Sequence, residues 1–417
     1  MDRQSTRPST ARRTLLGTLA IGIGTGTAGC LRPLLEEEQA AGNETDEENG
    51  NGAESEAEAW PMFGADPGGS GWADVSPPGE DVTEAWTADL DDGRGNPVVA
   101  DETVYVVARS TIRAYDATSG DEDWSTEVGL TGGTSPAPLV TDGIVYVTPG
   151  DGFLYALNAD DGERLWGESV ADGSESTFAS PRRVGGTIVA GDAARLGGFD
   201  AESGEEQWST ELPNTVLGTV VDDERAYVGI LGAGGEDSVY AFDAETGDSE
   251  WSYEGDRNGS NEPTVVDGTV YGAGMGDRGT NGYVYALDAE TGSERWTTEL
   301  ESTVVTSPAV VDGRLYVTDE DGELYAIGTD SGDVQWQESV WDESDREGNP
   351  PKISAPAVAD GRIHLGTLDG RVLAADASDG SVTWSIDVDT DVRCSPAVAN
   401  GRVSIVADSV LRAIETA

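Results

Sequence analysis

Short apolar runs separated by turns rich in glycine and aspartate recur along most of the chain. In one well-marked unit, four such runs lie at 135–140, 144–148, 153–157 and around Trp166. Runs of this length bounded by Gly and Asp are typical of β-strands, and no segment between the runs has the apolar spacing of a helix. The pattern therefore predicts units of four antiparallel strands joined by tight turns.

One turn motif recurs in these units. It is Asp-Ala-x-Thr-Gly-x-x-x-Trp, clearest at 288–296, and variants lie at 116–124, 158–166, 200–208, 243–251, 328–336 and 376–384. The Asp can bond its own turn and the Gly can take a positive φ, so the motif predicts a hairpin leading into the Trp-bearing fourth strand. Trp86 lacks the turn, and with it the motif tryptophans are Trp86, Trp124, Trp166, Trp208, Trp251, Trp296, Trp336 and Trp384.

The starts of the first strands agree in number with these tryptophans. They lie near residues 96, 135, 180, 215, 261, 307, 354 and 395. A period of about forty residues indicates stacked repeats, and repeats of this kind predict an all-β, eight-bladed β-propeller of four-stranded antiparallel blades. The last unit stops after three strands. We expect the strand at 82–90 to complete that last blade, which closes the ring and removes exposed sheet edges.

The repeated Trp has two interpretations. One ring per blade in the same register indicates packing between neighbouring blades, where each Trp can bury about 150–250 Å². The alternative is a groove of Trp rings that binds a sugar or a quinone. Packing is favoured, because a ligand contacts one or two blades whereas every blade needs a spacer.

The charge of the chain is extreme. Its 417 residues include 80 Asp and Glu against 24 Lys and Arg, a net charge of −56, and Lys352 is the only lysine. Since the acids occur in every repeat, they indicate adaptation to molar salt, which screens the self-repulsion. An acidic tail that binds a basic partner is the alternative. The same charge argues against nucleic acid as a partner, because phosphates require a basic surface.

The first 30 residues are expected to be a targeting signal. Arg12 and Arg13 precede the apolar run 15–23, which is too short to span a bilayer, and small residues stand before Cys30. Twin arginines are typical of Tat export. The arrangement resembles a Tat lipoprotein signal peptide in which Cys30 becomes the lipid anchor. An uncleaved N-terminal anchor is the alternative.

Composition divides the rest of the chain into two parts. Residues 31–59 are acidic and contain almost no large apolar side chain, so they cannot form a core. We expect them to be a disordered tether between a membrane and the folded domain. Residues 60–417 then form the propeller.

Few residues could carry catalysis or bind a metal. His364 is the only histidine and lies in an alternating strand, so a structural role is expected and no histidine-rich metal site or triad can be built. Cys394 is expected to be a small buried residue. The stretch 319–322 is similar to part of a Ca²⁺ loop but is too short for an EF-hand, and a hairpin turn explains it better. Neither a catalytic residue nor a metal site is predicted.

The repeats resemble the PQQ-like β-propeller family. The resemblance rests on Asp-Ala-x-Thr-Gly-x-x-x-Trp preceded by Ser-Pro-Ala-Val-x-x-Gly-x-Val-Tyr-Val and Gly-x-Leu-Tyr-Ala-Leu, best seen at 135–166 and 307–336. Residues 60–64 also resemble the preface that many members carry before the first blade. The lipoprotein arrangement is similar to that of the propeller subunit of the bacterial outer-membrane β-barrel assembly machinery, which implies a binding scaffold.

The family that the repeats resemble also has an enzymatic branch, the quinoprotein alcohol dehydrogenases. That branch implies pyrroloquinoline quinone held over a Trp beneath a disulfide of adjacent cysteines, with Ca²⁺ and an Asp base. This chain has no adjacent cysteines, and its acids recur at the same turn positions in every blade, so Ca²⁺ ligands cannot be mapped. We therefore expect neither the quinone nor calcium as a cofactor, and no enzyme.

The two faces of the expected propeller differ in sequence. Turns from first to second and from third to fourth strands lie on one side with nearly constant sequence, here termed the uniform face. Second-to-third turns and blade-to-blade links lie on the other side, the link face, and vary most in length, at 170–177, 231–238, 253–261, 273–282 and 341–352. Binding residues usually occupy variable loops. The candidate binding residues on this face are Arg257, Asn258, Asn261, Arg278, Asn281, Trp341, Arg346 and Lys352.

These observations predict a lipid-anchored propeller on the outer face of the cell membrane of an extreme halophile, with an archaeal source expected. It would act as a scaffold that binds an unidentified protein or ligand. A quinone-dependent dehydrogenase and a purely structural surface protein, with salt-tolerant loops that bind nothing, are the alternatives.

Overall fold

The computed structural model describes the backbone of residues 58–91, 93, 95–129, 136–170, 179–191, 194–230, 238–254, 258–276, 281–304, 306–340 and 353–417. All of them belong to one compact unit, Ser55–Ala417. Every regular element in these ranges is a β-strand. None of the described segments forms a helix that could cross a membrane.

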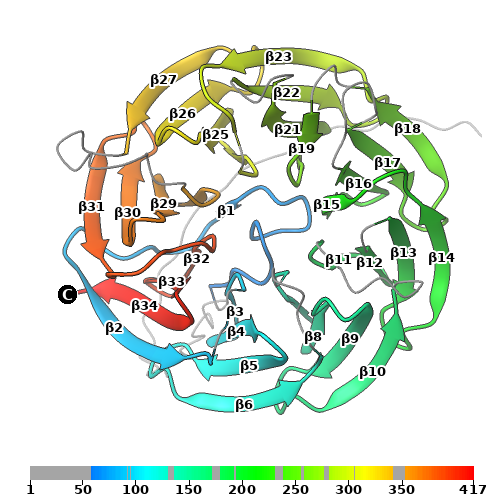
Figure 1. The fold of residues 1–417 in the computed structure, drawn as a ribbon, viewed down its shortest axis with the longest axis horizontal. Helices are drawn as coiled ribbons and strands as arrows, with labels where there is room; N and C mark the ends of the chain where they lie inside the picture. The colour runs from blue at the N-terminus through cyan, green and yellow to red at the C-terminus, as the bar shows by residue number, and fades with distance from the viewer. Residues whose placement is uncertain are drawn as a thin grey trace, which may run out of the picture. The chain divides into compact units, whose positions relative to one another are not determined.

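The strands form eight sheets, each built on a four-stranded antiparallel blade of a propeller seen end-on in Figure 1. Blade 1 contains β3 (Val98–Ala100), β4 (Thr103–Ala108), β5 (Thr111–Asp116) and β6 (Glu122–Glu127), and blade 2 contains β7 (Leu139–Thr141), β8 (Ile144–Val147), β9 (Phe153–Asn158) and β10 (Arg164–Ser169). Blade 3 contains β11 (Arg182–Val184), β12 (Thr187–Gly191), β13 (Arg195–Asp200) and β14 (Glu206–Glu211), and blade 4 contains β15 (Val216–Val221), β16 (Arg225–Ile230), β17 (Val239–Asp243) and β18 (Ser249–Tyr253).

The second half of the ring repeats this order. Blade 5 contains β20 (Thr264–Val266), β21 (Thr269–Met275), β22 (Gly282–Asp288) and β23 (Glu294–Leu300), and blade 6 contains β24 (Ala309–Val311), β25 (Arg314–Thr318), β26 (Glu323–Gly328) and β27 (Val334–Ser339). Blade 7 contains β28 (Ala357–Ala359), β29 (Arg362–Gly366), β30 (Arg371–Asp376) and β31 (Val382–Asp387), and blade 8 contains β32 (Ala397–Ala399), β33 (Arg402–Ala407), β34 (Val410–Thr416) and β2 (Val82–Asp89). The predicted eight-bladed fold is confirmed.

The ring closes as the sequence predicted. Strand β2 pairs with β34 in an antiparallel register that runs from Val82 opposite Thr416 to Asp89 opposite Val410. The next residue continues the ladder, since the N–H of Leu90 donates to the carbonyl of Ser409 at 2.8 Å. The N-terminal strand therefore completes the last blade.

Two strands were not predicted. Strand β1 (Trp72–Ala73) pairs in parallel with β28, and β19 (Asn258–Ser260) pairs with the end of β21. Blades 5 and 7 therefore belong to five-stranded sheets, and part of the expected link at 253–261 is a strand. Both strands are only two or three residues long, too short to leave an apolar pattern in the sequence.

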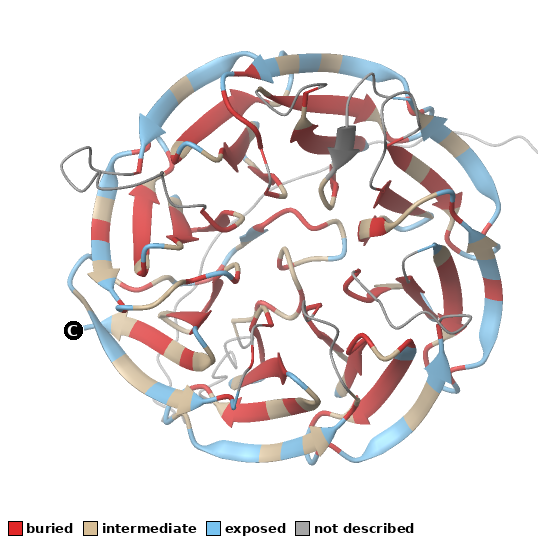
Figure 2. Cartoon of the chain, viewed as in Figure 1, coloured by how far each residue is buried: buried red, intermediate tan, exposed pale blue. Residues whose placement is uncertain are grey.

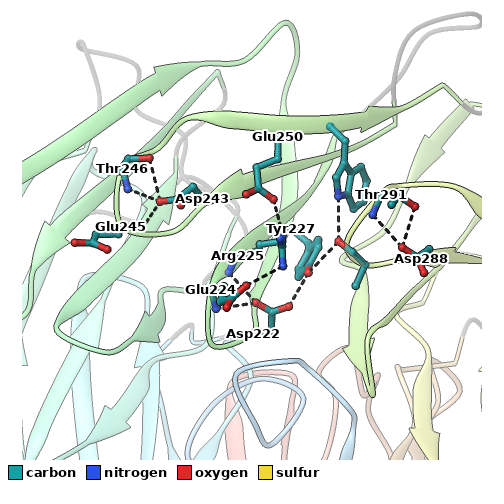
Figure 3. Close-up of polar contacts among 12 residues, drawn as sticks. Asp222, Glu224, Arg225, Tyr227, Asp243, Glu245, Thr246, Glu250, Asp288 and Thr291 are labelled. Atoms are coloured by element: carbon teal, nitrogen blue, oxygen red, sulfur yellow. Dashed lines mark hydrogen bonds and ion pairs between the residues drawn. The ribbon is translucent and has the colours of Figure 1, made fainter. Parts of the chain in front are cut away.

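The turn motif has the predicted geometry. In blade 5, Asp288 Oδ1 accepts hydrogen bonds from the N–H of Thr291 at 3.0 Å and from its hydroxyl at 2.8 Å, while Gly292 has a φ of 68°. Figure 3 shows this turn beside the equivalent turn of blade 4, where Asp243 and Thr246 repeat the contacts. The motif is thus a hairpin held by its own side chains.

The motif Trp rings pack between neighbouring blades, as expected. A Cβ on Gly247 in the turn of blade 4 would lie 2.4 Å from the ring of Trp208 in blade 3, and Gly292 stands in the same relation to Trp251 at 2.6 Å. The indole N–H of Trp208 donates to the carbonyl of Ala244 at 3.1 Å. Each motif glycine is therefore required twice, for its positive φ and for the ring that covers it.

Burial follows from this packing. Figure 2 shows that the inner three strands of the blades are largely buried, whereas the outermost strands are mostly exposed or intermediate. In the outer strand β14, the buried Trp208 is surrounded by exposed Glu206, Gln207 and Ser209. The core is therefore a set of interfaces between blades, and the outer strands carry the acidic surface.

His364 occupies a position that is Tyr in five other blades. The ring centroids of those tyrosines lie 5.9–6.2 Å from the ring centroid of the motif Trp in their own blade, and the ring centroid of His364 lies 5.9 Å from that of Trp384. Its ring is fully buried, with Nδ1 3.2 Å from the carbonyl of Ala357 and no partner for Nε2. This placement fits the structural role expected for the only histidine.

The burial of His364 predicts a measurable pH dependence. Desolvation lowers its pKa to about 4, against about 6.5 in an unfolded chain, so the unfolded state binds more protons between these values. The free energy of unfolding should fall by about 3 kcal/mol as the pH falls from 6.5 to 4. In His364→Phe this contribution should be absent. Urea unfolding of both proteins across this pH range gives the difference between their free energies of unfolding, in which the titrations of the shared carboxylates cancel. If the two free energies change with pH in parallel, the prediction is wrong.

Candidate functional site

Most residues predicted for the link face lie outside the described part of the chain. These are Arg257, Arg278, Trp341, Arg346 and Lys352, and the proposed signal residues Arg12, Arg13 and Cys30 also lie outside it. The backbone of Asn258 and the whole of Asn261 and Asn281 are described.

The structure brings Asn258 and Asn281 to the same end of β21. Asn258 pairs with Met275, and the N–H of the following Gly276 donates to the carbonyl of Asn281 at 2.8 Å. The Asn281 side-chain amide donates to Glu299. These two predicted residues therefore share one patch of the link face.

Asn261 has a different environment. Its side-chain amide donates to the carbonyls of Val304 at 3.4 Å and Thr306 at 3.3 Å, in the link that follows blade 5. Its backbone N–H donates to the carbonyl of Ala273 at 3.2 Å. These contacts give Asn261 a role in joining blades 5 and 6.

A hollow lies on the uniform face, between blades 3 and 4. It has a volume of about 730 Å³ and is lined by Val184, Gly185, Gly186, Thr187, Asp200, Gln207, Asp223, Glu224, Asp243, Ala244, Glu245 and Glu250. We term it the blade 3–4 groove. The repeat pattern did not predict it, although one signal was present: blade 3 has Gly185 in its first turn where other blades have residues such as Asp142, Asp267 and Asp312.

A hydrogen-bond network forms the blade 4 wall of this groove (Figure 3). Arg225 pairs with Glu250 and lies 3.3 Å from Glu224. Asp222 Oδ1 accepts from the N–H of Arg225 at 2.7 Å, and its Oδ2 accepts from the hydroxyl of Tyr227 at 2.6 Å. Burial raises the pKa of Tyr227, so this hydroxyl stays protonated and remains a donor.

The groove is anionic. Its lining includes six carboxylates, Asp200, Asp223, Glu224, Asp243, Glu245 and Glu250. Hydrogen bonds from Ser203 lower the pKa of Asp200, and those from Thr246 lower that of Asp243, so both are ionised at neutral pH. Such a lining attracts cations and repels anionic ligands.

The N-terminal segment of the propeller crosses its centre, where Figure 1 shows it inside the ring. Trp60 pairs with Val99 of blade 1. Further on, backbone carbonyls accept hydrogen bonds of 2.6–2.9 Å from valine N–H groups on the inner strands of five blades. The acceptors are Pro61, Pro67, Gly68, Ser70 and Gly71, and the donors are Val140, Val221, Val265, Val310 and Val358. We term residues 60–73 the axial segment.

A small cavity lies beside the axial segment. Its volume is about 20 Å³, and its lining combines Trp60, Phe63, Gly64, Gly69 and Gly71 with residue–proline pairs of four inner strands, Asn96, Pro97, Ser307, Pro308, Ala355, Pro356, Ser395 and Pro396. A cavity of this size has room for about one water molecule. The chain itself therefore occupies this part of the axis.

The remaining residues singled out in the sequence are structural. Asp319 Oδ1 accepts from the N–H groups of Asp321 and Glu323, both at 3.0 Å, which confirms the hairpin turn at 319–322. Cys394 is buried as predicted, and burial raises the pKa of its thiol to about 12. No group of three or more His, Cys, Asp and Glu suited to a metal ion occurs among the residues whose placement is described.

Curated proteins of two kinds are similar to parts of this chain. Quinohemoprotein alcohol dehydrogenase of Comamonas testosteroni is 30% identical over 152 residues, which are 31% of this chain and 22% of that protein. Outer membrane protein assembly factor BamB of Yersinia pestis is 28% identical over 132 residues, 31% of this chain and 33% of that protein. The chain thus spans about a fifth to a third of the length of these relatives.

Solved structures of the same two kinds share the fold. The Comamonas testosteroni dehydrogenase has a TM-score of 0.68 at 16% identity, covering 85% of this chain and 80% of that one. BamB from Moraxella catarrhalis has a TM-score of 0.61 at 19% identity, covering 80% and 97%. A family model described as outer membrane protein assembly factor BamB matches residues 73–215, 179–276, 258–351 and 338–417. The chain therefore belongs to this PQQ-like propeller family, which the sequence motifs had indicated.

Proposed function

We propose that this protein is a cell-surface scaffold that binds a protein partner through the link face of its propeller. The proposal rests on one observation: the centre of the propeller and the motif Trp rings are both occupied by packing within the chain, so neither is free to bind a ligand. The axial segment occupies the centre and leaves a cavity of about 20 Å³. The motif Trp rings cover the turns of neighbouring blades. Recognition is then left to surface loops, as in other rigid scaffolds.

Relatives named as assembly factors support a protein as the partner. BamB proteins are among the similar sequences and among the similar structures. Asn258 and Asn281 mark the described part of the proposed surface, beside the end of β21. The sequence places Arg257 and Arg278 in the same link and turn as these two residues. The proposed surface continues through Trp341, Arg346 and Lys352, which lie in the link at 341–352.

The location of the protein is part of the proposal. The twin Arg12 and Arg13, the apolar run and Cys30 support Tat export and a lipid anchor on the outer face of the membrane. Residues 31–59 would then tether the propeller. The net charge of −56 supports a halophilic, archaeal source.

A quinone-dependent dehydrogenase is the second candidate, because quinoprotein dehydrogenases are also among the relatives. The two hollows described above do not favour pyrroloquinoline quinone. The axial cavity of about 20 Å³ is far smaller than the few hundred cubic ångströms of a cofactor pocket. The larger blade 3–4 groove is lined by six carboxylates, which would repel the carboxylates of the quinone.

Exchanging two residues of the proposed surface provides the test. In Trp341→Ala/Arg346→Ala, capture of the partner by cross-linking on intact cells should fall at least tenfold, since Trp and Arg are the residue types that dominate protein interfaces. The melting temperature should not change. Leu165→Ala in the outer strand of blade 2, where Leu165 is 50% exposed, is the matched control and should capture the partner normally.

Two results would contradict the scaffold. Equal capture of the partner by the double variant and by the control would show that the link face is not the binding surface. Reduction of a dye by purified protein given pyrroloquinoline quinone and Ca²⁺ in molar salt would favour the dehydrogenase instead.

A further inference from the structure

Three inner-strand residues depart from the repeat in three successive blades. Blades 6, 7 and 8 have Ala309, Ala357 and Ala397 at one inner-strand position, where blade 3 has Arg182. Two residues earlier in the repeat, where other blades have Ser, Ala or Asn, blade 4 has Gly218 and blade 5 has Glu262. A large cation thus stands where the other blades have uncharged residues, and a missing side chain and a carboxylate stand where the others have Ser, Ala or Asn.

Arg182 is fully buried and reaches the axial segment. Its Nη1 donates to the carbonyls of Phe63 at 2.7 Å and Asp66 at 3.1 Å. Its Nε donates to the carbonyl of Thr219 in blade 4 at 2.9 Å. One guanidinium therefore bonds two blades and the axial segment together, and its side chain has no exposed surface.

Glu262 supplies the opposite charge from blade 5. Its carboxylate pairs with Arg182 Nη2, and its side chain is only 11% exposed. Burial raises the pKa of the Glu262 carboxyl, and the guanidinium opposes this shift. A buried ion pair is screened by salt far less than a surface pair, so this contact keeps its strength in molar salt.

Gly218 makes room for that carboxylate. A Cβ at this position would lie 2.2 Å from Cβ of Glu262, closer than two carbon atoms can approach. The departures in blades 3, 4 and 5 are therefore parts of one arrangement. Arg182 connects this arrangement to the axial segment through the backbone carbonyls of residues 63 and 66, which lie apart from the Trp interfaces between blades.

We infer that Arg182, Gly218 and Glu262 form a latch that holds the axial segment as a plug in the centre of the propeller. The plug is bound to the blades by backbone hydrogen bonds, which include the Trp60–Val99 bridge and the short β1–β28 pairing. The latch is the charged contact that fixes the plug at blades 3 to 5. When the latch is broken, the plug leaves as a unit while the blades stay folded. The axial cavity then widens into the space that the plug had filled.

Hydrogen exchange of the full chain in molar salt tests the latch. The N–H groups of Val221 and Val265 donate to the plug carbonyls of Pro67 and Gly68, so they report its departure. In Arg182→Met their exchange should accelerate at least tenfold, while amides of β22 and β26 keep the wild-type rates. Arg183→Met is the matched control, because the neighbouring Arg183 makes an exposed pair with Asp142. It should leave both sets unchanged.

Two outcomes overturn the inference. Unchanged exchange at Val221 and Val265 would show that the latch does not hold the plug, and equal acceleration in β22 and β26 would show that plug and blades open together. If Arg182→Met does not fold, Glu262→Gln decides, since it removes one charge and keeps the shape. Acceleration confined to the plug contacts supports the latch, and any other pattern contradicts it. This result does not depend on the identity of the partner.

Discussion

Replacing Trp208 with Ala is expected to lower the free energy of unfolding by about 3–5 kcal/mol. Trp208 is only 8% exposed, and its ring covers the turn glycine of the next blade. The substitution removes the ring, empties the space between blades 3 and 4, and leaves the carbonyl of Ala244 without its indole donor. Urea unfolding in molar salt, followed by tryptophan fluorescence, measures the loss.

A matched control separates packing from a general loss of apolar surface. Val334 begins the outer strand β27 and is 42% exposed, so Val334→Ala should change the free energy of unfolding by no more than about 0.5 kcal/mol. Trp208→Phe, which keeps an aromatic ring without the N–H group, should fall between the two. Equal effects of Trp208→Ala and Val334→Ala would show that the motif Trp is not a spacer between blades.

Removing the closing strand should have the largest effect of all. A chain that starts at residue 96 lacks β1, β2 and the axial segment, so β34 becomes an exposed edge. The missing contacts include the β2 ladder, the bond from the Trp86 indole to the carbonyl of Ala117 at 3.0 Å, and the Arg412–Glu84 ion pair. We expect a loss of more than about 5 kcal/mol, enough to unfold a typical domain, and self-association through the free edge.

A chain that starts at residue 58 is the control for this truncation, because it keeps every contact described above. Its melting temperature should equal that of the full chain. A peptide of residues 80–91, added to the shorter truncation, should restore part of the stability by pairing with β34. A truncation from residue 96 that melts as the control does would contradict closure by β2. Differential scanning calorimetry and light scattering give both readouts.

The repeated features were predictable because each is encoded locally and many times. The turn Asp and Gly, and the Trp that follows, recur along the chain, so their hairpins and their number follow from counting residues. The closing strand followed from the same count, since Trp86 stood without its turn and the last unit lacked a strand. Because the same pattern occurs in every unit, an ambiguous stretch in one unit could be interpreted from the others, and the fold could be predicted from the sequence.

The candidate functional site was harder to predict from the sequence than the fold. The sequence predicted Asn258 and Asn281 for one face, and the structure places both at the same end of β21. For Asn261, also predicted as a binding residue, only the structure shows that its amide donates hydrogen bonds to the backbone of the following link. The blade 3–4 groove depends on what two neighbouring blades leave unfilled. The size of this unfilled space is set by the packing between two blades, and the sequence of a single unit does not encode it.

By itself, the sequence determined the architecture: eight blades, their hairpins, the Trp spacers and the strand that closes the ring. Only the tertiary structure decided what fills the axis. Residues 60–73 carry almost no strand pattern, so their sequence does not say where they dock. Arg182 and Glu262 are 80 residues apart and meet because the ring brings blades 3 and 5 around a common centre. Repeats specify contacts between neighbouring blades, whereas a contact that skips a blade forms only where the inner strands converge on the axis.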